Sequence, residues 1–244
     1  MTAGGLLEVA DLHVRIGGSH ILQGVDLTVA AGGVTALLGR NGAGKTTTIK
    51  AILGLVPRTG SVRFDGAELA HLPTHLIVRR GLGYAPEDRG VFTALTVAEN
   101  LRLAERRGAR QRYDLVFELF PELRKRSAQP AGTLSGGQQQ MLALGRALLN
   151  DNRMLLVDEP TKGLAPRIVT EVAGVLERVA SAVPILLVEQ NLGLVRRIAG
   201  QVVVIDQGRV VHTSPAASLL ADTERVRELL GVATRRPEPS AELK

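Results

Sequence analysis

Cysteine is absent from the 244 residues of this chain. Disulfide bonds, thiolate metal sites and cysteine nucleophiles are therefore excluded. Aromatic residues amount to only 2% of the sequence, so the stacking platforms that bind single-stranded nucleic acid are scarce. The five histidines are scattered without the spacing of metal ligands, which argues against a structural metal site.

Long apolar runs are absent as well. No run reaches the ~18 residues needed to span a bilayer, and no basic-then-apolar signal peptide opens the sequence. We therefore expect a cytoplasmic protein that does not itself cross a membrane. Hydrophobic residues make up 45% of the chain and charged residues 22%, which is the mixture of a globular protein with a packed core.

The net charge of +6 has two interpretations. A basic chain can bind nucleic acid or an anionic membrane surface, or it can simply carry solvated arginines. We favour solvated arginines and expect no nucleic-acid partner. The same choice applies to the basic central region, which forms either a solvated helix face or a surface toward a membrane partner and its anionic lipids. Its basic residues are Arg102, Arg106, Arg107, Arg110, Arg112, Arg124, Lys125 and Arg126.

Segments of strand type alternate with helical segments, which predicts an α/β fold with a mainly parallel sheet. Residues 34–38 read as a buried strand that leads into a glycine-rich loop, and residues 44–55 read as the helix after it. Parallel strands are expected to resume at residues 154–157, 185–188 and 202–205. Short antiparallel strands are expected near the beginning, over residues 7–16, 25–29 and 61–64.

Residues 90–150 are rich in helical patterns and poor in strands, which predicts a helical subdomain inserted in the α/β core. Thr96 and Glu99 have the spacing of a capping box at the start of its first helix. The expected helices span residues 96–107, 113–119 and 135–149. We expect residues 1–236 to form a single domain and the polar, proline-bearing residues 237–244 to form a disordered tail.

The loop after residues 34–38 matches the phosphate-binding pattern G-x-x-x-x-G-K-[ST]. Its glycines let backbone N–H groups point at phosphates, and the following helix adds its dipole. Lys45 supplies positive charge for the β- and γ-phosphates, and the Thr46 hydroxyl can ligate Mg²⁺. A glycine turn with an incidental lysine is disfavoured, because the motif follows a strand and opens a helix. The predicted nucleotide-binding residues are Gly39, Arg40, Asn41, Gly42, Ala43, Gly44, Lys45, Thr46 and Thr47.

Two acidic residues, Asp158 and Glu159, end the apolar run that begins at Met154. Ligands of such sheets bind beyond the carboxyl ends of the strands. Asp158 is predicted to hold Mg²⁺, directly or through water, and Glu159 to orient or deprotonate the water that attacks the γ-phosphate. A pair of surface acids in a turn is the alternative, which the phosphate loop in the same chain disfavours.

The pentapeptide Leu134-Ser135-Gly136-Gly137-Gln138 places two glycines and a hydroxyl at the start of a helix. Free N–H groups and the helix dipole would make this a second anion site, whereas the simpler alternative is an ordinary N-capped helix. A chain with one phosphate loop does not need such a site for itself. The phosphate loop, this pentapeptide and the Asp158-Glu159 strand, in this order, resemble the nucleotide-binding subunits of ATP-binding-cassette (ABC) transporters over residues 6–232.

This resemblance implies a P-loop NTPase fold of the ABC type, with ATP and Mg²⁺ as cofactors. Two cassettes of the family pack head to tail, so that the pentapeptide of one clamps the γ-phosphate held by the phosphate loop of the other. The implied partners are a second ABC ATPase subunit, identical or different, transmembrane permease subunits and, indirectly, a solute-binding protein. The chain would then lie peripherally on the cytoplasmic face of the membrane. The residues that face the second cassette would be Ser135, Gly136, Gly137 and Gln138.

Four positions depart from the general pattern of this family. The glutamine that links Mg²⁺ to the helical subdomain falls at Glu87, whose carboxylate can also ligate the metal. The switch histidine falls at Gln190, which can hydrogen-bond the γ-phosphate but cannot become cationic. The usual aspartate of the loop after the Asp-Glu pair falls at Ala165. The aromatic residue that stacks on adenine falls near Ile16, which offers only apolar contact.

Three of these departures match one subgroup, the second of two different ATPase subunits in branched-chain amino acid importers. Glu87, Ala165 and Gln190 lie in segments that carry this likeness, whereas Ile16 is not explained by it. Importers for urea or amides share much of the pattern and remain an alternative. The matching segments are residues 86–92, 135–148, 163–166 and 188–191.

Three functions compete on this basis. A transport ATPase, in which ATP closes two cassettes and hydrolysis reopens them, is favoured. A soluble ABC ATPase that acts in DNA repair, on the ribosome or in cofactor assembly is disfavoured. Residues 46–158 contain no coiled-coil heptads of the kind that repair ATPases carry, and the chain has one cassette where ribosome-acting ATPases have two. A regulatory module with little turnover is supported by Gln190 and Ala165 and opposed by Glu159. Residues 87–92 are interpreted as a moving linker to the permease, with a simple surface loop as the alternative.

Overall fold

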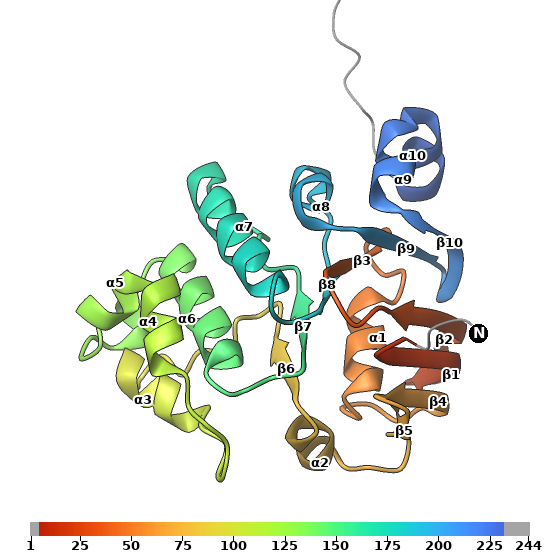
Figure 1. Cartoon of the computed structure of the whole chain (residues 1–244). Coiled ribbons are helices and arrows are strands. Elements are labelled where there is room, and N and C mark those ends of the chain that lie inside the picture. The colour runs from red at the N-terminus through yellow and green to blue at the C-terminus, as the bar shows by residue number, and fades with distance from the viewer. Residues whose placement is uncertain (1–4, 232–244) are drawn as a thin grey trace, which may run out of the picture.

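The computed structural model describes residues 5–231 and places the expected parallel strands in one sheet (Figure 1). The strand order is β10-β9-β3-β8-β7-β6, and β10, at one edge, pairs antiparallel with β9. The prediction of a mainly parallel sheet is therefore confirmed. The strands are β3 (Val34–Leu38), β6 (Leu82–Ala85), β7 (Met154–Asp158), β8 (Ile185–Val188), β9 (Gln201–Asp206) and β10 (Arg209–Pro215).

Helices connect these strands and cover the sheet. None of the helices within residues 5–231 is both long enough and apolar enough to cross a membrane. The helices are α1 (Lys45–Ile52), α2 (Thr74–Arg79), α3 (Val97–Leu103), α4 (Tyr113–Leu119), α5 (Pro121–Lys125), α6 (Gly136–Leu148), α7 (Pro166–Ala180), α8 (Leu192–Ile198), α9 (Ala216–Ala221) and α10 (Thr223–Leu230).

Both faces of the parallel sheet are packed against other elements. β3, β7 and β8 are buried along their whole length, as is usual for parallel sheets with two covered faces. Neighbouring residues of β7 accordingly belong to different cores. Leu156 packs in the core that contains α1, whereas Leu155 and Val157 pack in the core that contains α6 and α7. The sheet therefore holds the carboxyl end of β7 rigidly.

The first part of the chain forms a second, antiparallel sheet, as predicted. Its order is β2-β1-β4-β5, and it packs in the same core as α1. Residues of β1 that point to this core are buried, and the register shifts near Asp11, whose φ is 49°. The strands are β1 (Leu7–Ile16), β2 (Ser19–Val29), β4 (Thr59–Phe64) and β5 (Ala67–Glu68).

Two helices end earlier than the sequence predicts. α1 ends at Ile52 and not at residue 55, because Gly54 adopts a φ of 68° and its N–H donates to Ala51. α3 ends at Leu103 and not at residue 107, and Gly108, with a φ of 80°, then turns the chain. The capping box of Thr96 and Glu99 at the start of α3 is present as predicted.

The central region contains α3, α4, α5, α6 and the short 3-10 turn Ala131–Thr133. Figure 1 shows these helices gathered on one side of β6 and β7, with α1 on the other side. Whether they form a subdomain of their own remains a prediction. The predicted tail at residues 237–244, and the end of the predicted domain at residues 232–236, lie outside the described residues.

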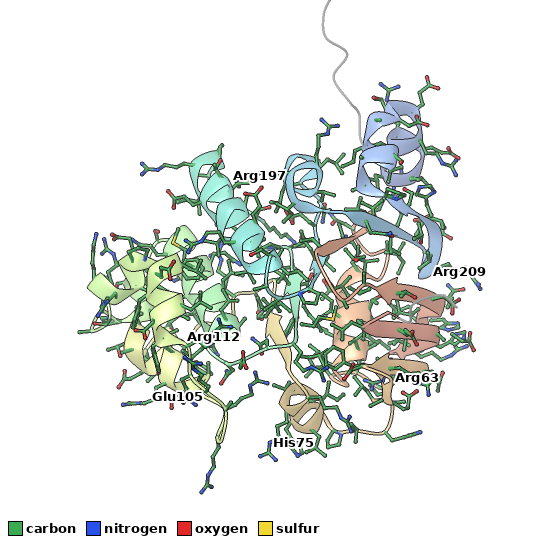
Figure 2. The ribbon with its side chains drawn as sticks, viewed as in Figure 1. Arg63, His75, Glu105, Arg112, Arg197 and Arg209 are labelled. Atoms are coloured by element: carbon green, nitrogen blue, oxygen red, sulfur yellow. The ribbon has the colours of Figure 1, made fainter. Side chains whose placement is uncertain are left out.

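Some of the arginines lie on elements that are far apart (Figure 2), and some of them pair with acidic residues. Figure 2 shows Arg63, Arg112, Arg197 and Arg209 on separate parts of the molecule. Arg112 lies 3.6 Å from Asp151, and Arg197 lies 2.6 Å from Glu177. This distribution favours the interpretation of the net positive charge as solvated or ion-paired arginines.

Candidate active site

The phosphate loop joins β3 to α1 and depends on its glycines. Gly42 and Gly44 have φ values of 80° and 112°, in the left-handed region that other residues rarely adopt. Gly39 has a φ of 153°, and a Cβ atom added to it would lie 2.2 Å from the carbonyl oxygen of Ile205. The loop can therefore keep its shape against β9 only with glycine at position 39.

Lys45 begins α1 and points back over the loop. Its buried Nζ donates to the carbonyl oxygens of Gly39 at 3.0 Å and Arg40 at 3.1 Å, and it lies 3.6 Å from Oε1 of Glu159. No side chain caps the start of α1. The first N–H groups of a helix have no intrahelical acceptor, so this end can bind an anion. The phosphate loop, Lys45 and the start of α1 thus form a site of positive electrostatic potential that can bind phosphate.

Thr46 and Asp158 bring the phosphate loop and the end of β7 together. The Thr46 hydroxyl donates to Oδ1 of Asp158 at 3.1 Å, and Asp158 is fully buried. Burial raises the pKa of Asp158 to about 6, although the hydrogen bond from Thr46 opposes this effect. The negative charges of Glu87 and Glu159 raise this pKa further. A cation placed beside Asp158 would restore its usual acidity.

The donor set at Asp158 fits a magnesium ion. The second oxygen of Asp158, Oδ2, is buried without a hydrogen-bond partner among the described residues. Within residues 5–231 no three His, Cys, Asp or Glu side chains form a complete metal cage. Mg²⁺ typically uses one or two protein ligands and completes its shell with water and phosphate oxygens. Asp158 and the Thr46 hydroxyl are therefore suited to this ion when a phosphate lies in the loop.

Glu159 follows Asp158 in a left-handed conformation with a φ of 44°. Such backbone conformations of non-glycine residues are concentrated at functional sites. The carboxylate is buried, and its Oε1 accepts a hydrogen bond of 2.6 Å from Nε2 of Gln190. The same Nε2 lies 2.6 Å from Oδ1 of Asn41 in the phosphate loop. Gln190 thus joins the phosphate loop to the acidic end of β7, and its predicted hydrogen bond to the γ-phosphate remains a prediction.

A cavity of about 550 Å³ opens beside these residues. Glu87, from the loop after β6, lines it together with Thr46 and Asp158, and its role as a magnesium ligand remains a prediction. Lys162 was not among the predicted site residues, yet its Nζ forms an ion pair with Oε1 of Glu87. This ion pair raises the pKa of Lys162. Further lining residues are Lys50, Tyr84, Pro86, Asp88 and Arg89.

A buried hydrogen bond joins the loops that follow β7 and β8. No sequence motif predicted it. The Thr161 hydroxyl donates to Oε1 of Glu189, and both residues are buried. Burial raises the pKa of Glu189 to about 7. This bond links the segment after Glu159 to the segment that carries Gln190, and so fixes their relative positions.

The pentapeptide at residues 134–138 lies at the start of α6. Ser135 caps this helix: its Oγ accepts from the N–H of Gln138 at 3.3 Å, and Oε1 of Gln138 accepts from the N–H of Ser135 at 3.0 Å. Ser135 and Gly136 are exposed, whereas Gly137 is buried, and a Cβ added there would lie 3.0 Å from Ile168. Because α6 and α1 lie on opposite sides of β6 and β7, this segment and the phosphate loop of the same chain are apart (Figure 1).

The remaining predicted positions lie at the edges of the site. Ile16 is the last residue of β1 and is 48% exposed, so its side chain is accessible to a ligand. Ala165 immediately precedes α7 and provides no side-chain cap for this helix. Thr47 lies in the first turn of α1, directly after Thr46. The functional roles of these three residues remain predictions.

Comparisons with known proteins show which family this chain resembles. The sequence model of a family described as ABC transporter matches residues 22–162. The chain is similar to the high-affinity branched-chain amino acid transport ATP-binding protein BraG of Pseudomonas aeruginosa, with 40% identity over 89% of this chain and 96% of the relative. The corresponding protein BraF of the same bacterium is 31% identical over 93% of this chain and 98% of the relative. A solved structure of an ATP binding subunit of an ABC transporter is 29% identical, has a TM-score of 0.76, and is matched over 93% of this chain and 95% of that chain.

Proposed function

This chain belongs to the ABC transporter family as an ATP-binding cassette ATPase, and we propose that it powers the import of branched-chain amino acids through a membrane permease. The observation that carries the proposal is the meeting of Lys45, Thr46 and Asp158 at the carboxyl end of the parallel sheet, with Glu159 beside them. This arrangement supports phosphoryl transfer to water, since each group has a task in that reaction.

In this proposal, Lys45 and the N–H groups of the loop bind the phosphates of ATP. Thr46 and Asp158 would hold Mg²⁺, which would supply positive charge to offset that of the phosphates. Glu159 orients the attacking water or accepts its proton, and Gln190 holds the carboxylate of Glu159 in place. Ile16 contributes apolar contact to adenine in place of aromatic stacking.

We further propose that the site is completed by a second cassette. The support is the position of the pentapeptide at the start of α6, which lies across β6 and β7 from α1 (Figure 1), and the exposure of its Ser135 and Gly136. Head-to-tail pairing would bring these residues, with Gly137 and Gln138, to the γ-phosphate bound by the partner. The second cassette would be a different subunit of the kind that BraF represents, with an identical copy as the alternative.

The proposed solute rests on similarity between sequences. The chain is 40% identical to BraG and 31% identical to BraF, both of which are named as branched-chain amino acid transport ATP-binding proteins. The greater identity to BraG supports a role as the second ATPase subunit of such an importer. Import of urea or amides is the alternative within the same class, and a soluble ABC ATPase is the alternative outside it.

The remaining partners follow from this role. We place the chain on the cytoplasmic face of the membrane, bound to permease subunits that receive solute from a binding protein. The basic central region is suited to lie near that surface, although several of its arginines are used within the chain. Arg106, for example, donates to the carbonyl oxygen of Asp151 at 3.1 Å.

The test is co-purification of the chain with its permease subunits and second cassette in lipid nanodiscs. Leucine, isoleucine or valine, presented with the binding protein, should raise ATP hydrolysis by the assembled complex. Stimulation by urea or an amide, and not by these amino acids, would replace the proposed solute. An ATPase rate that is the same with and without solute and permease would contradict the transport role.

A further inference from the structure

Lys162 lies between two carboxylates that belong to different loops of the site. Its Nζ forms an ion pair with Oε1 of Glu87 and lies 3.5 Å from Oε2 of Glu159. Glu87 follows β6, whereas Glu159 and Lys162 follow the neighbouring strand β7. Lys162 therefore connects two adjacent loops at the carboxyl end of the sheet, beside the cavity that it lines with Thr46 and Asp158.

Lys162 is one of three basic residues that line this cavity, the others being Lys50 and Arg89. Lys162 forms an ion pair with one of the acids of the cavity, Glu87. Three carboxylates line the cavity, those of Glu87, Asp88 and Asp158, and the triphosphate of ATP would add several further negative charges. Glu87 lines the cavity from the loop after β6 with a side chain that is 35% exposed, whereas Asp158 is fully buried and accepts a hydrogen bond from Thr46. An uncompensated carboxylate in the lining of the cavity would repel a phosphate bound there and lower the affinity for nucleotide.

We propose that Lys162 is a positioning residue that offsets the charge of Glu87 and holds this carboxylate beside the magnesium site. This inference rests on the proposed function, because it requires ATP to bind at the phosphate loop. Glu87 and Lys162 act as one neutral unit: Glu87 can then serve the metal without repelling the triphosphate. Because Lys162 acts through Glu87, the change in ATP affinity on removing the charge of Lys162 must depend on the charge at position 87.

The contribution of this pair to folding is expected to be small. The Lys162 side chain is 58% exposed and that of Glu87 is 35% exposed. Exposed ion pairs contribute little to stability because water and salt screen them. Lys162→Met should therefore change the midpoint of thermal unfolding of the nucleotide-free protein by less than about 2 °C. A change in nucleotide affinity without a change in this midpoint identifies an electrostatic role at the site.

The experiment measures the dissociation constant for ATP by isothermal titration calorimetry, once in EDTA and once with excess Mg²⁺. Lys162→Met should weaken binding about threefold to tenfold in EDTA and less with Mg²⁺, because the cation also offsets the charge of Glu87. The double variant Glu87→Gln/Lys162→Met should bind within about twofold of Glu87→Gln alone. Lys162→Arg should behave like the wild type. Lys125→Met removes a lysine that pairs with Glu122 on α5 and should leave affinity unchanged.

Two results would overturn the proposal. If Lys162→Met weakens binding equally in the wild-type chain and in the Glu87→Gln variant, Lys162 acts on the phosphates directly or through Glu159, and not through Glu87. If Lys162→Met leaves affinity unchanged in EDTA, the charge of Glu87 needs no compensation. Lys45→Ala separates this failure from a failure of the proposed function, because wild-type affinity of that variant would remove the phosphate-loop assignment itself.

Discussion

Replacing Asp158 by asparagine should stabilise the fold at neutral pH while it removes the response to magnesium. Asp158 is fully buried, and burial raises its pKa from an ordinary 3.8 to about 6. The folded state therefore binds this proton more tightly than the unfolded state does. Stability falls as the pH rises from about 4 to about 6, and the full penalty, about 3 kcal/mol, is present above that range.

Asparagine removes this penalty but introduces a smaller one. Its Oδ1 can still accept the hydrogen bond from Thr46, whereas its Nδ2 replaces the oxygen Oδ2 that is buried without a partner among the described residues. An unsatisfied buried amide costs about 1–2 kcal/mol. The net gain for Asp158→Asn at pH 7.5 is therefore about 1–2 kcal/mol, which corresponds to about 2–8 °C in the midpoint of thermal unfolding.

The assay is thermal unfolding followed by circular dichroism at pH 4 and pH 7.5. Asp158→Asn should gain stability only at pH 7.5, and the matched variant Asp151→Asn, at an exposed aspartate, should gain none. Mg²⁺ added to ATP should raise the unfolding midpoint of the wild type and not that of Asp158→Asn. An equal effect of Asp158→Asn at both pH values would refute the reasoning from burial, and a retained response to Mg²⁺ would refute the metal assignment.

Three further predictions concern the phosphate loop and its neighbour. Lys45→Ala should weaken ATP binding on the order of 100-fold, because it removes the charge aimed at the phosphates; unchanged affinity in calorimetry would contradict the loop assignment. Gly39→Ala should lower the free energy of unfolding by roughly 3 kcal/mol, because its Cβ would meet the carbonyl of Ile205. Gly42→Ala should lower it by only about 1 kcal/mol, because its Cβ would meet nothing within 4 Å. Equal losses in urea unfolding would count against this view of the loop. Gln190→His should leave the fold intact and raise ATP turnover in the assembled complex, because histidine can become cationic; a collapse in stability would instead show that Gln190 is a packing residue.

Patterns with a regular period could be predicted accurately from the sequence. The bounds of β1 and β3 agree with prediction, because β1 alternates over a long run and β3 is apolar except for Thr35 and precedes a glycine loop. β6 was not predicted, since Leu82-Gly83-Tyr84-Ala85 is short and contains a glycine. That glycine is explained by packing, because a Cβ at Gly83 would lie 2.6 Å from the side chain of Leu155 in β7.

The site, too, could be predicted only where a local sequence motif specifies it. Motif spacing was sufficient to bring Thr46 and Asp158 together, because both belong to patterns with a known place at the carboxyl end of a sheet. The ion pair of Lys162 with Glu87 joins residues 75 positions apart and depends on the pairing of β6 with β7. No local pattern specifies that pairing. The buried contact of Thr161 with Glu189 was missed for the same reason.

We propose that the segment at Ser135 serves the ATP of a second cassette and not that of its own chain. The most direct test measures particle mass by light scattering for the Glu159→Gln chain, alone and with its partner cassette, with and without ATP. We predict a two-cassette mass only with ATP, and its loss when Ser135→Glu is added to place a negative charge at the phosphate. The same Ser135→Glu change should leave ATP affinity of the isolated chain at the wild-type value. Persistent pairing of that variant, or a loss of ATP affinity comparable to that of Lys45→Ala, would contradict the account.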